Sequence, residues 1–114
     1  MIPKDRKVER DIFPTFPQKG KVFNSNSLNL KVYSNPLSET NKTKFSFIVS
    51  KKVSNKAVKR NLLKKRGYSI LDEVLDKTKD GFVCIFFFKK ESLGVDFNDL
   101  KKEILLLLKK SSVI

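Results

Sequence analysis

The chain has 114 residues, 25 of them Lys or Arg and 12 Asp or Glu, which gives a formal net charge of +13 and a pI near 10. This length predicts one domain over residues 1–114, and an apolar content of 39% with ten Phe residues excludes a wholly disordered chain. Because His is absent, His-based acid–base chemistry, Cys/His zinc sites and Ser-His-Asp triads are excluded within this chain. The single Cys allows no internal disulfide, which suits a reducing compartment.

The first half of the chain predicts a short helix and two strands. Residues 4–13 can form a helix that the prolines after it would stop. Apolar and polar side chains alternate over residues 28–33 and again over 45–50, on either side of a loop beginning at Asn35-Pro36, so we expect two half-buried strands paired as a hairpin. The side facing the core would carry Leu28, Leu30, Val32, Phe45, Phe47 and Val49. The other side would be an open face carrying Asn29, Lys31, Tyr33, Ser46, Ile48 and Ser50.

A long helix is expected to begin near Lys56, with Ser54 or Asn55 as its N-cap. Its core stripe, at spacings of three and four, consists of Leu63, Gly67, Ile70, Leu71 and Val74. The glycine in this stripe predicts a weak point in the helix, because glycine is a poor helix former. The opposite face of the helix carries Asn61, Lys64, Lys65 and Tyr68.

The last third of the chain predicts a buried strand and a second helix. Asp80-Gly81 ends the long helical region, and the continuous apolar run over 82–88 is typical of a buried strand, with Cys84 as a small buried hydrophobe. Asp96 is expected to cap a final amphipathic helix with Phe97, Leu100, Ile104, Leu107 and Leu108 turned inward. Together these elements predict an α+β sandwich, with two helices on one face of a sheet and a polar, open second face.

The most charged part of the chain, residues 50–66, reads SKKVSNKAVKRNLLKKR and contains eight Lys or Arg and no acid. Like charges at this density repel one another unless a polyanion lies alongside, which favours a nucleic-acid partner over a merely solvated helix face. The interleaved apolar residues Val53, Val58, Leu62 and Leu63 indicate a folded element. The candidate RNA-binding residues are Lys51, Lys52, Lys56, Lys59, Arg60, Asn61, Lys64, Lys65 and Arg66. For Asn61 the alternative is an ordinary helix-surface amide.

Two further clusters have competing interpretations. Phe13 and Phe16 can either stack on bases at an edge of the open sheet face or pack in the core. The acids near the end of the long helix, Asp72, Glu73, Asp76 and Asp80, are interpreted as a solvated surface, and no metal site is expected.

Residues 50–66 resemble the signature of the bacterial ribonuclease P protein subunit, S-K-K-x-G-x-A-V-x-R-N-R-x-K-R-x-x-R. The matching positions are Ser50, Lys51, Lys52, Ala57, Val58, Arg60, Asn61 and Lys64. The segment IFPTFPQKG at 12–20 is similar to the D-F-x-x-V-F-x-x-G element of that family, and the strands and final helix follow in the order of the family. The chain departs from the pattern at Leu62 and Tyr68, where the family has Arg, and at Gly67, where it has an aliphatic residue.

The resemblance implies a two-layer sandwich in the order α-β-β-β-α-β-α with a left-handed βαβ crossover, as in a ribosomal protein domain, against the usual right-handed rule. It also implies the accessory protein of a ribozyme that acts as an endoribonuclease and removes the 5′ leader from precursor tRNA. The implied partners are the catalytic RNA, which holds Mg²⁺ and performs the hydrolysis, and precursor tRNA; no cofactor, catalytic residue or small-molecule substrate is expected in the protein. The implied leader-binding groove consists of Phe13, Phe16, Asn29, Lys31, Ile48, Ser50 and Tyr68.

The alternative function is a non-catalytic RNA-binding module, such as a ribosome-associated protein. No signal peptide is expected, and the longest apolar runs, 82–88 and 104–108, are too short to span a bilayer. We therefore expect a cytoplasmic protein with no membrane partner.

Overall fold

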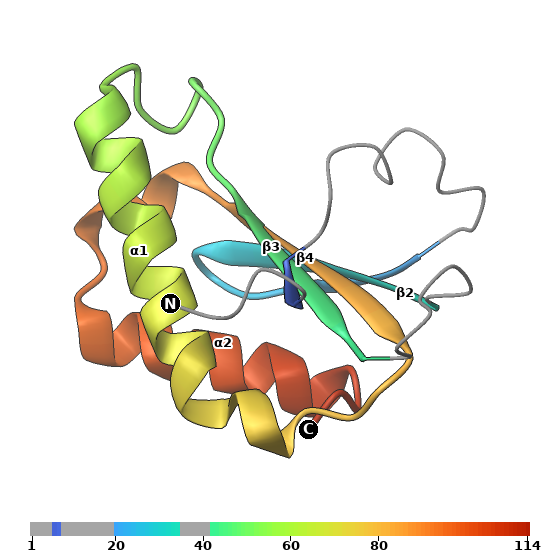
Figure 1. Cartoon of the computed structure of the whole chain (residues 1–114). Coiled ribbons are helices and arrows are strands. Elements are labelled where there is room, and N and C mark those ends of the chain that lie inside the picture. The colour runs from blue at the N-terminus through green and yellow to red at the C-terminus, as the bar shows by residue number, and fades with distance from the viewer. Residues whose placement is uncertain (1–5, 8–19, 35–41) are drawn as a thin grey trace.

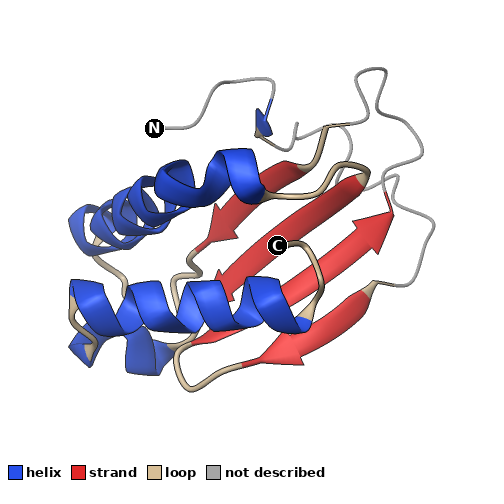
Figure 2. Ribbon diagram, turned by 90° about the horizontal axis from the view of Figure 1, so that it is seen from below, coloured by secondary structure: helices blue, strands red, loops and turns tan. Residues whose placement is uncertain are grey.

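The computed structural model describes residues 6–7, 20–34 and 42–114. Its elements are the strands β1 (Lys21–Asn24), β2 (Leu28–Ser34), β3 (Lys44–Ile48) and β4 (Phe82–Phe88), the helices α1 (Ala57–Val74) and α2 (Phe97–Lys110), and the short 3₁₀ helices η3 (Leu75–Lys77) and η4 (Lys90–Gly94). Both long helices lie on one face of the four-stranded sheet, which gives two layers (Figures 1 and 2). The predicted α+β sandwich is confirmed.

The predicted helix over residues 4–13 lies mostly outside the described residues, and so do Phe13 and Phe16. The described part of that segment, Arg6 and Lys7, is not helical at Lys7, which forms an isolated parallel β-bridge with Phe45. The Arg6 guanidinium donates to the carbonyl of Thr43 at 2.8 Å. The helix prediction is therefore wrong at Lys7, where contacts with β3 decide the backbone conformation.

The strand order in the sheet is β1-β2-β4-β3. β2 pairs antiparallel with β1 and with β4, and β4 pairs parallel with β3. The predicted hairpin between residues 28–33 and 45–50 is therefore wrong, because β4 lies between these two strands. β4 takes a central position since its residues 83–86 are all buried, and only a strand covered on both faces can bury such a run. The hairpin forms instead between β1 and β2, where the N–H of Ser25 donates to the carbonyl of Leu28 at 2.8 Å.

The chain passes from β3 through α1 into the parallel strand β4. This βαβ crossover is left-handed (Figure 1), which confirms the prediction made from the family resemblance. Almost all such connections in other proteins are right-handed, so this connection identifies the fold more sharply than the count of strands and helices does.

The core between the sheet and the helices closes around Phe47. Its ring stacks on Phe86 at a centroid distance of 4.8 Å and 10° between the planes. A Cβ at Gly67 would lie 2.7 Å from the Phe47 ring, so only glycine lets α1 approach β3 this closely. The prediction of a weak point is corrected: α1 continues unbroken through Gly67, which is a close-packing position.

Most predicted core residues are buried, including Ile70 and Leu71 in α1 and Ile104 and Leu107 in α2, at 0% exposure each. The inward assignment of Phe97 is wrong in part, because Phe97 is 39% exposed. Val58 and Leu62, apolar residues outside the predicted core stripe, are 80% and 46% exposed. Val58 and Leu62 lie on a flank of α1 that is turned roughly 100° or more from Leu63, at about 100° per residue. Phe97 lies on the inward stripe of α2, but it is the first residue of the helix, so its ring is covered only in part.

The sheet face away from the helices is not wholly polar and open. Asn29, Lys31 and Ile48 are half-buried on this face, as the alternation predicts. Val83 at 0% and Ile85 at 4% exposure lie on the same face of β4 and are buried. The predicted open face is therefore wrong at its centre.

Candidate nucleic-acid interface

Helix α1 begins without a side-chain cap. Its N-cap residue is Lys56, whose side chain makes no capping hydrogen bond, and the first turn contains no acid. Ser54 Oγ accepts the N–H of Lys56 at 3.2 Å, but Ser54 lies two positions before the N-cap residue, so the prediction of Ser54 or Asn55 as N-cap is wrong. The free N–H groups of the first turn and the positive end of the helix dipole therefore face solvent beside cationic side chains.

Lys51 and Lys52 lie in a turn before α1, and the helix begins next to Lys56 as predicted. The turn is closed by the N–H of Val53, which donates to the carbonyl of Ser50 at 3.1 Å. The Val53 side chain is 6% exposed and anchors the turn in the core, whereas both lysines are exposed. The turn thus holds two cations outward next to the start of the helix.

The cations of α1 divide between two flanks of the helix. At about 100° per residue, Arg60 and Lys64 lie on the flank toward β3, and Lys59 and Arg66 lie on the opposite flank toward η4. Arg60 Nη1 donates to the carbonyl of Ser54 at 2.8 Å, which ties the preceding turn to the helix and fixes the guanidinium. Asn61 and Lys65 lie between the flanks and are exposed.

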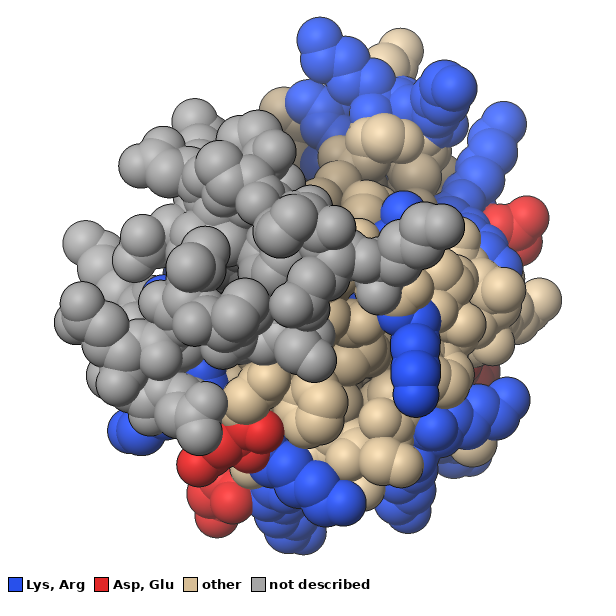
Figure 3. All heavy atoms as spheres, turned by 90° about the vertical axis from the view of Figure 1, so that its right-hand side faces the viewer, with Lys and Arg blue, Asp and Glu red and all other residues tan. Residues whose placement is uncertain are grey.

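The eight cations of residues 51–66 are not neutralised by the described residues: none of the eight forms an ion pair with an acid in the part of the chain that the structure describes. An ion pair between the two helices joins Lys101 of α2 to Glu73 of α1 at 3.2 Å, in the second half of α1. Figure 3 shows Lys and Arg gathered at the end of the molecule formed by this turn and the start of α1, whereas acidic and basic side chains are mixed at the other end. This end of the molecule attracts polyanions.

The predicted groove residues separate into two places. Tyr68 lies at the edge of β3 on the helix side, where its ring meets Phe47 edge-on at 4.9 Å and its hydroxyl accepts the N–H of Phe47 at 3.4 Å. Lys7 Nζ lies 5.0 Å from the centre of the Tyr68 ring. The exposed Ser50 follows the end of β3 on the same side as the basic turn. Tyr68 and Ser50 therefore border the basic end of the molecule.

The remaining described groove residues, Asn29, Lys31 and Ile48, lie on the second face of the sheet. Asn29 and Ile48 both pair with Phe87, from opposite sides of β4, so they are about 10 Å apart at the usual strand spacing. Lys31 Nζ lies 5.4 Å from the centre of the Phe87 ring. Asn29 Oδ1 is buried and accepts no hydrogen bond from the described residues.

The acids that follow the basic half of α1, Asp72, Glu73, Asp76 and Asp80, are exposed. Within residues 6–7, 20–34 and 42–114, no three acidic or Cys side chains come close enough together to hold a metal ion. Burial raises the pKa of the Cys84 thiol, which keeps it protonated, and its position at 0% exposure confirms it as a core residue. No helix of the described chain is long and apolar enough to cross a membrane.

One feature on the η4 flank was missed by the sequence reading: a pocket lined by Lys59, Leu62, Leu63, Arg66 and Leu93. Four of these residues lie on α1, but Leu93 comes from η4, thirty positions later in the chain than Leu63. The helical spacing of the four α1 residues could have shown that they share one flank of the helix. The contribution of Leu93 could not be predicted, because no local pattern in the sequence places η4 beside α1.

Known proteins match both the sequence and the fold. A family model described as ribonuclease P matches residues 3–112. The ribonuclease P protein component of Pseudanabaena sp. is 28% identical over 115 residues, covering 100% of this chain and 97% of the relative. That of Synechocystis sp. is 26% identical over 102 residues, covering 90% and 81%.

Solved structures agree in fold. A Staphylococcus aureus RNase P protein mutant with defective mRNA degradation activity superposes with a TM-score of 0.84 at 16% identity, covering 97% of this chain and 92% of that one. The RNase P protein from Thermotoga maritima gives a TM-score of 0.76 at 23% identity, covering 91% and 96%. The family model spans nearly the whole chain and the left-handed α+β fold agrees with it, so the chain belongs to the ribonuclease P protein family, the protein component of a bacterial ribonuclease.

Proposed function

We propose that this chain binds the catalytic RNA of ribonuclease P through the turn before α1 and the first half of α1, and that it also binds the 5′ leader of precursor tRNA. The observation that carries the proposal is the set of eight cations over residues 51–66, which no described acid neutralises. Binding of these cations to phosphates releases condensed counterions, which is the main sequence-independent source of affinity for nucleic acids.

The start of α1 supports the assignment of this end to the catalytic RNA. Lys51 and Lys52 approach from the turn, and Lys56 stands at the uncapped helix terminus, where a phosphate would meet free N–H groups and the positive dipole end. Arg60 is held by the Ser54 carbonyl, so part of its guanidinium is preoriented and its other N–H groups can donate to a phosphate.

The leader assignment rests on the second face of the sheet. The half-buried ring of Phe87 with Lys31 above it offers a stacking surface beside a phosphate partner, the pair of features that proteins use for single strands. Phe13 and Phe16 stay predictions for this groove.

In this proposal the RNA partner and its Mg²⁺ perform the hydrolysis in the cytoplasm, and the protein contributes binding and orientation. The absence of His from the sequence supports this division of labour, since the commonest general acid–base residue is missing. The protein requires no cofactor of its own in this scheme.

Reconstitution with a bacterial ribonuclease P RNA and precursor tRNA at low magnesium tests the proposal. We expect the protein alone to leave precursor tRNA intact and the complex to cleave it at magnesium concentrations where the RNA alone is slow. Cleavage by highly purified protein without RNA would overturn the assignment of hydrolysis to the RNA. Binding to the RNA with no effect on cleavage would favour the alternative, a non-catalytic RNA-binding module.

The site is tested by replacing Lys51, Lys52 and Lys64 together with Ala. The slope of log affinity against log salt should fall by roughly two to three units, because each cation paired with a phosphate contributes about 0.7–0.9 unit to it. The matched control replaces the exposed Lys77, Lys102 and Lys110, which changes the net charge equally at other parts of the surface. Equal slopes for the two triple variants would place the RNA-binding surface elsewhere.

The leader assignment is tested by the ratio of affinities for precursor and mature tRNA at saturating catalytic RNA. Lys31→Ala should lower this ratio about 5-fold or more and leave assembly with the catalytic RNA nearly intact. Lys21→Ala is the control, because Lys21 pairs with Val32 and so lies on the alternate side of the sheet. An unchanged ratio in a folded Lys31 variant contradicts the groove assignment.

A further inference from the structure

The pocket on the η4 flank of α1 is built from both apolar and cationic side chains. Lys59 and Arg66 stand two helical turns apart on α1, with Leu62 and Leu63 between them. Leu93 of η4 forms the facing wall. Its volume of about 170 Å³ is several times the roughly 30 Å³ of a water molecule, so the pocket has room for a group larger than a single water.

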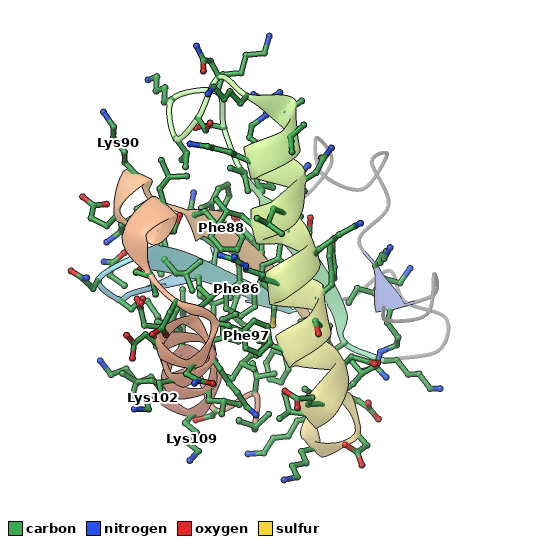
Figure 4. All side chains as sticks on the ribbon, turned by 90° about the vertical axis from the view of Figure 1, so that its left-hand side faces the viewer. Phe86, Phe88, Lys90, Phe97, Lys102 and Lys109 are labelled. Carbon is green, nitrogen blue, oxygen red and sulfur yellow. The ribbon has the colours of Figure 1, made fainter. Side chains whose placement is uncertain are left out.

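The apolar walls of this pocket are not covered by the described protein. Leu62 is 46% and Leu93 42% exposed, although exposed large aliphatic side chains carry a hydration cost that burial would remove. Figure 4 looks onto this side of the molecule, with η4 beside the first half of α1 and Phe97 between α1 and the start of α2. Phe97, 39% exposed, adds apolar surface on the same side.

The wall formed by η4 is held in place before any partner arrives. The Ser92 side chain, 1% exposed, donates to the carbonyl of Lys89 at 2.6 Å. Lys89 in turn is anchored to the β1–β2 turn, since its Nζ donates to the carbonyl of Ser25 at 2.7 Å and its N–H to the carbonyl of Ser27 at 2.8 Å. Leu93 is therefore presented from a fixed support, which reduces the entropy cost of binding.

We propose that this pocket takes one unpaired nucleobase of the RNA partner, with the base between Leu62 and Leu93 and its flanking phosphates on Lys59 and Arg66. This inference rests on the proposed function, because it gives the bound RNA a second point of attachment on the flank opposite Arg60. An apolar slot between two cations about 10.5 Å apart along the helix, at 1.5 Å per residue, matches a base and the phosphates on either side of it.

The charge around the pocket favours an RNA partner. Lys59 and Arg66 belong to the same run of eight cations as the turn before α1, so an RNA bound to that run lies close to the pocket. The apolar walls Leu62 and Leu93 lie between the cations Lys59 and Arg66. In RNA the base is uncharged and the negative charges lie on the phosphates, which matches an apolar slot flanked by cations.

The test measures binding of the catalytic RNA by the full-length chain and by the variants Leu62→Ser and Leu93→Ser. Each variant should weaken binding about 5- to 100-fold, the range for removal of one stacked or buried base, with the salt slope unchanged. Lys59→Ala and Arg66→Ala should instead lower the salt slope by about one unit each. The matched control is Leu106→Ser on α2, which is 47% exposed and lies outside the pocket, and its affinity should stay within about two-fold of the wild type.

A second readout identifies the occupant directly. Chemical modification of the Watson–Crick edges of the RNA should reveal an unpaired base that the wild-type protein protects and that becomes reactive with the Leu93→Ser protein, but not with the Leu106→Ser protein. Urea unfolding of each variant separates loss of the pocket from loss of the fold.

The outcomes separate failure of the pocket proposal from failure of the proposed function. If the wild-type protein binds no catalytic RNA, the proposed function fails and the pocket proposal fails with it. If the wild-type protein binds the RNA, and the folded Leu62 and Leu93 variants keep both its affinity and its protection of RNA bases, the pocket proposal alone is overturned. A protein partner would then be the remaining occupant of the pocket.

Discussion

The two helices of this protein differ most at their ends. In α2, Asp96 Oδ1 accepts the N–H of Asp99 at 2.8 Å as an N-cap, an acid stands in the first turn, and Lys109 and Lys110 occupy the last turn. In α1, Lys56 stands at the N-cap without a side-chain bond, no acid occupies the first turn and no base the last. Both ends of α2 carry residues that stabilise a helix, whereas neither end of α1 does.

The difference separates stability from function. Cations at a helix N-terminus oppose the helix dipole, at a cost of about 0.3–1 kcal/mol each when exposed. Helix α1 compensates through its second half, where Ile70, Leu71 and Val74 are buried against the sheet. Positions where local rules fail inside an otherwise consistent fold are where binding is expected, and in α1 these are the positions of the basic cluster.

The largest expected effect concerns the compensating half of α1. Gly67→Ala should reduce the free energy of unfolding by about 1–3 kcal/mol, because the new Cβ would lie 2.7 Å from the Phe47 ring and overpacking outweighs the better helix propensity of Ala. Urea unfolding measures this. The control is Gly94→Ala, where nothing lies within 4 Å of the new Cβ. If Gly67→Ala were as stable as the control, the close packing of α1 against Phe47 would not contribute to stability.

The next effect tests the capped helix. Asp96→Ala should lower stability by about 1 kcal/mol, the usual value of an N-cap, and leave RNA affinity nearly unchanged. Asn98→Ala, an exposed position one residue into the same helix, is the control and should change stability by less than about 0.5 kcal/mol. A decrease equal to that of the control would show that the Asp96 hydrogen bond contributes nothing.

Giving α1 the cap that it lacks should move stability and binding in opposite directions. Lys56→Asp should raise the free energy of unfolding by about 0.5–1 kcal/mol, because an acid caps the helix and suits its dipole. The same change should weaken binding of the catalytic RNA and lower the salt slope by about one unit. Lys56→Gln removes the charge without adding an acid and separates the two effects. A variant that gained both stability and affinity would contradict the division between the two helices.

Local patterns in the sequence predicted the elements well, because each depends on a few neighbouring residues. The alternation of Leu28, Leu30 and Val32 and the spacing of Ile70 and Leu71 correspond directly to buried faces. The pairing of strands could not be read in this way. β2 and β3 look like a hairpin until β4, about fifty residues further along, takes the place between them.

The same distinction applies to the candidate site. Charge density alone located the basic segment, because a run of Lys and Arg is visible in the sequence without knowledge of what packs beside it. The separation of Arg60 and Lys59 onto different flanks follows from helix geometry, but the use of each flank depends on what packs beside it. The family resemblance supplied the left-handed crossover, which no local pattern contains and which the general rule for such connections opposes.

The smallest expected effect concerns how α2 is tied to the sheet. Glu103 accepts hydrogen bonds from the Ser25 hydroxyl at 2.6 Å, the Ser27 hydroxyl at 2.6 Å and the Ser27 N–H at 2.7 Å, which joins α2 to the β1–β2 turn. Burial raises the pKa of Glu103, but these hydrogen bonds and the charge of Lys89 outweigh it, so the pKa is lowered overall. The ionised carboxylate is therefore the form that stabilises the fold.

The sign of the pH effect follows from that lowered pKa. A group whose pKa is lower in the folded state contributes stability above its unfolded pKa, and the contribution is lost as the pH falls through the folded pKa. Glu103→Gln should therefore be less stable than the wild type near neutral pH, and the difference should shrink as the pH falls below about 4. Urea unfolding at a series of pH values measures this, with the exposed Glu91→Gln as the control. A difference that stays constant down to acid pH would mean that Glu103 acts through its shape and hydrogen bonds alone, and that its charge has no part in holding α2 to the sheet.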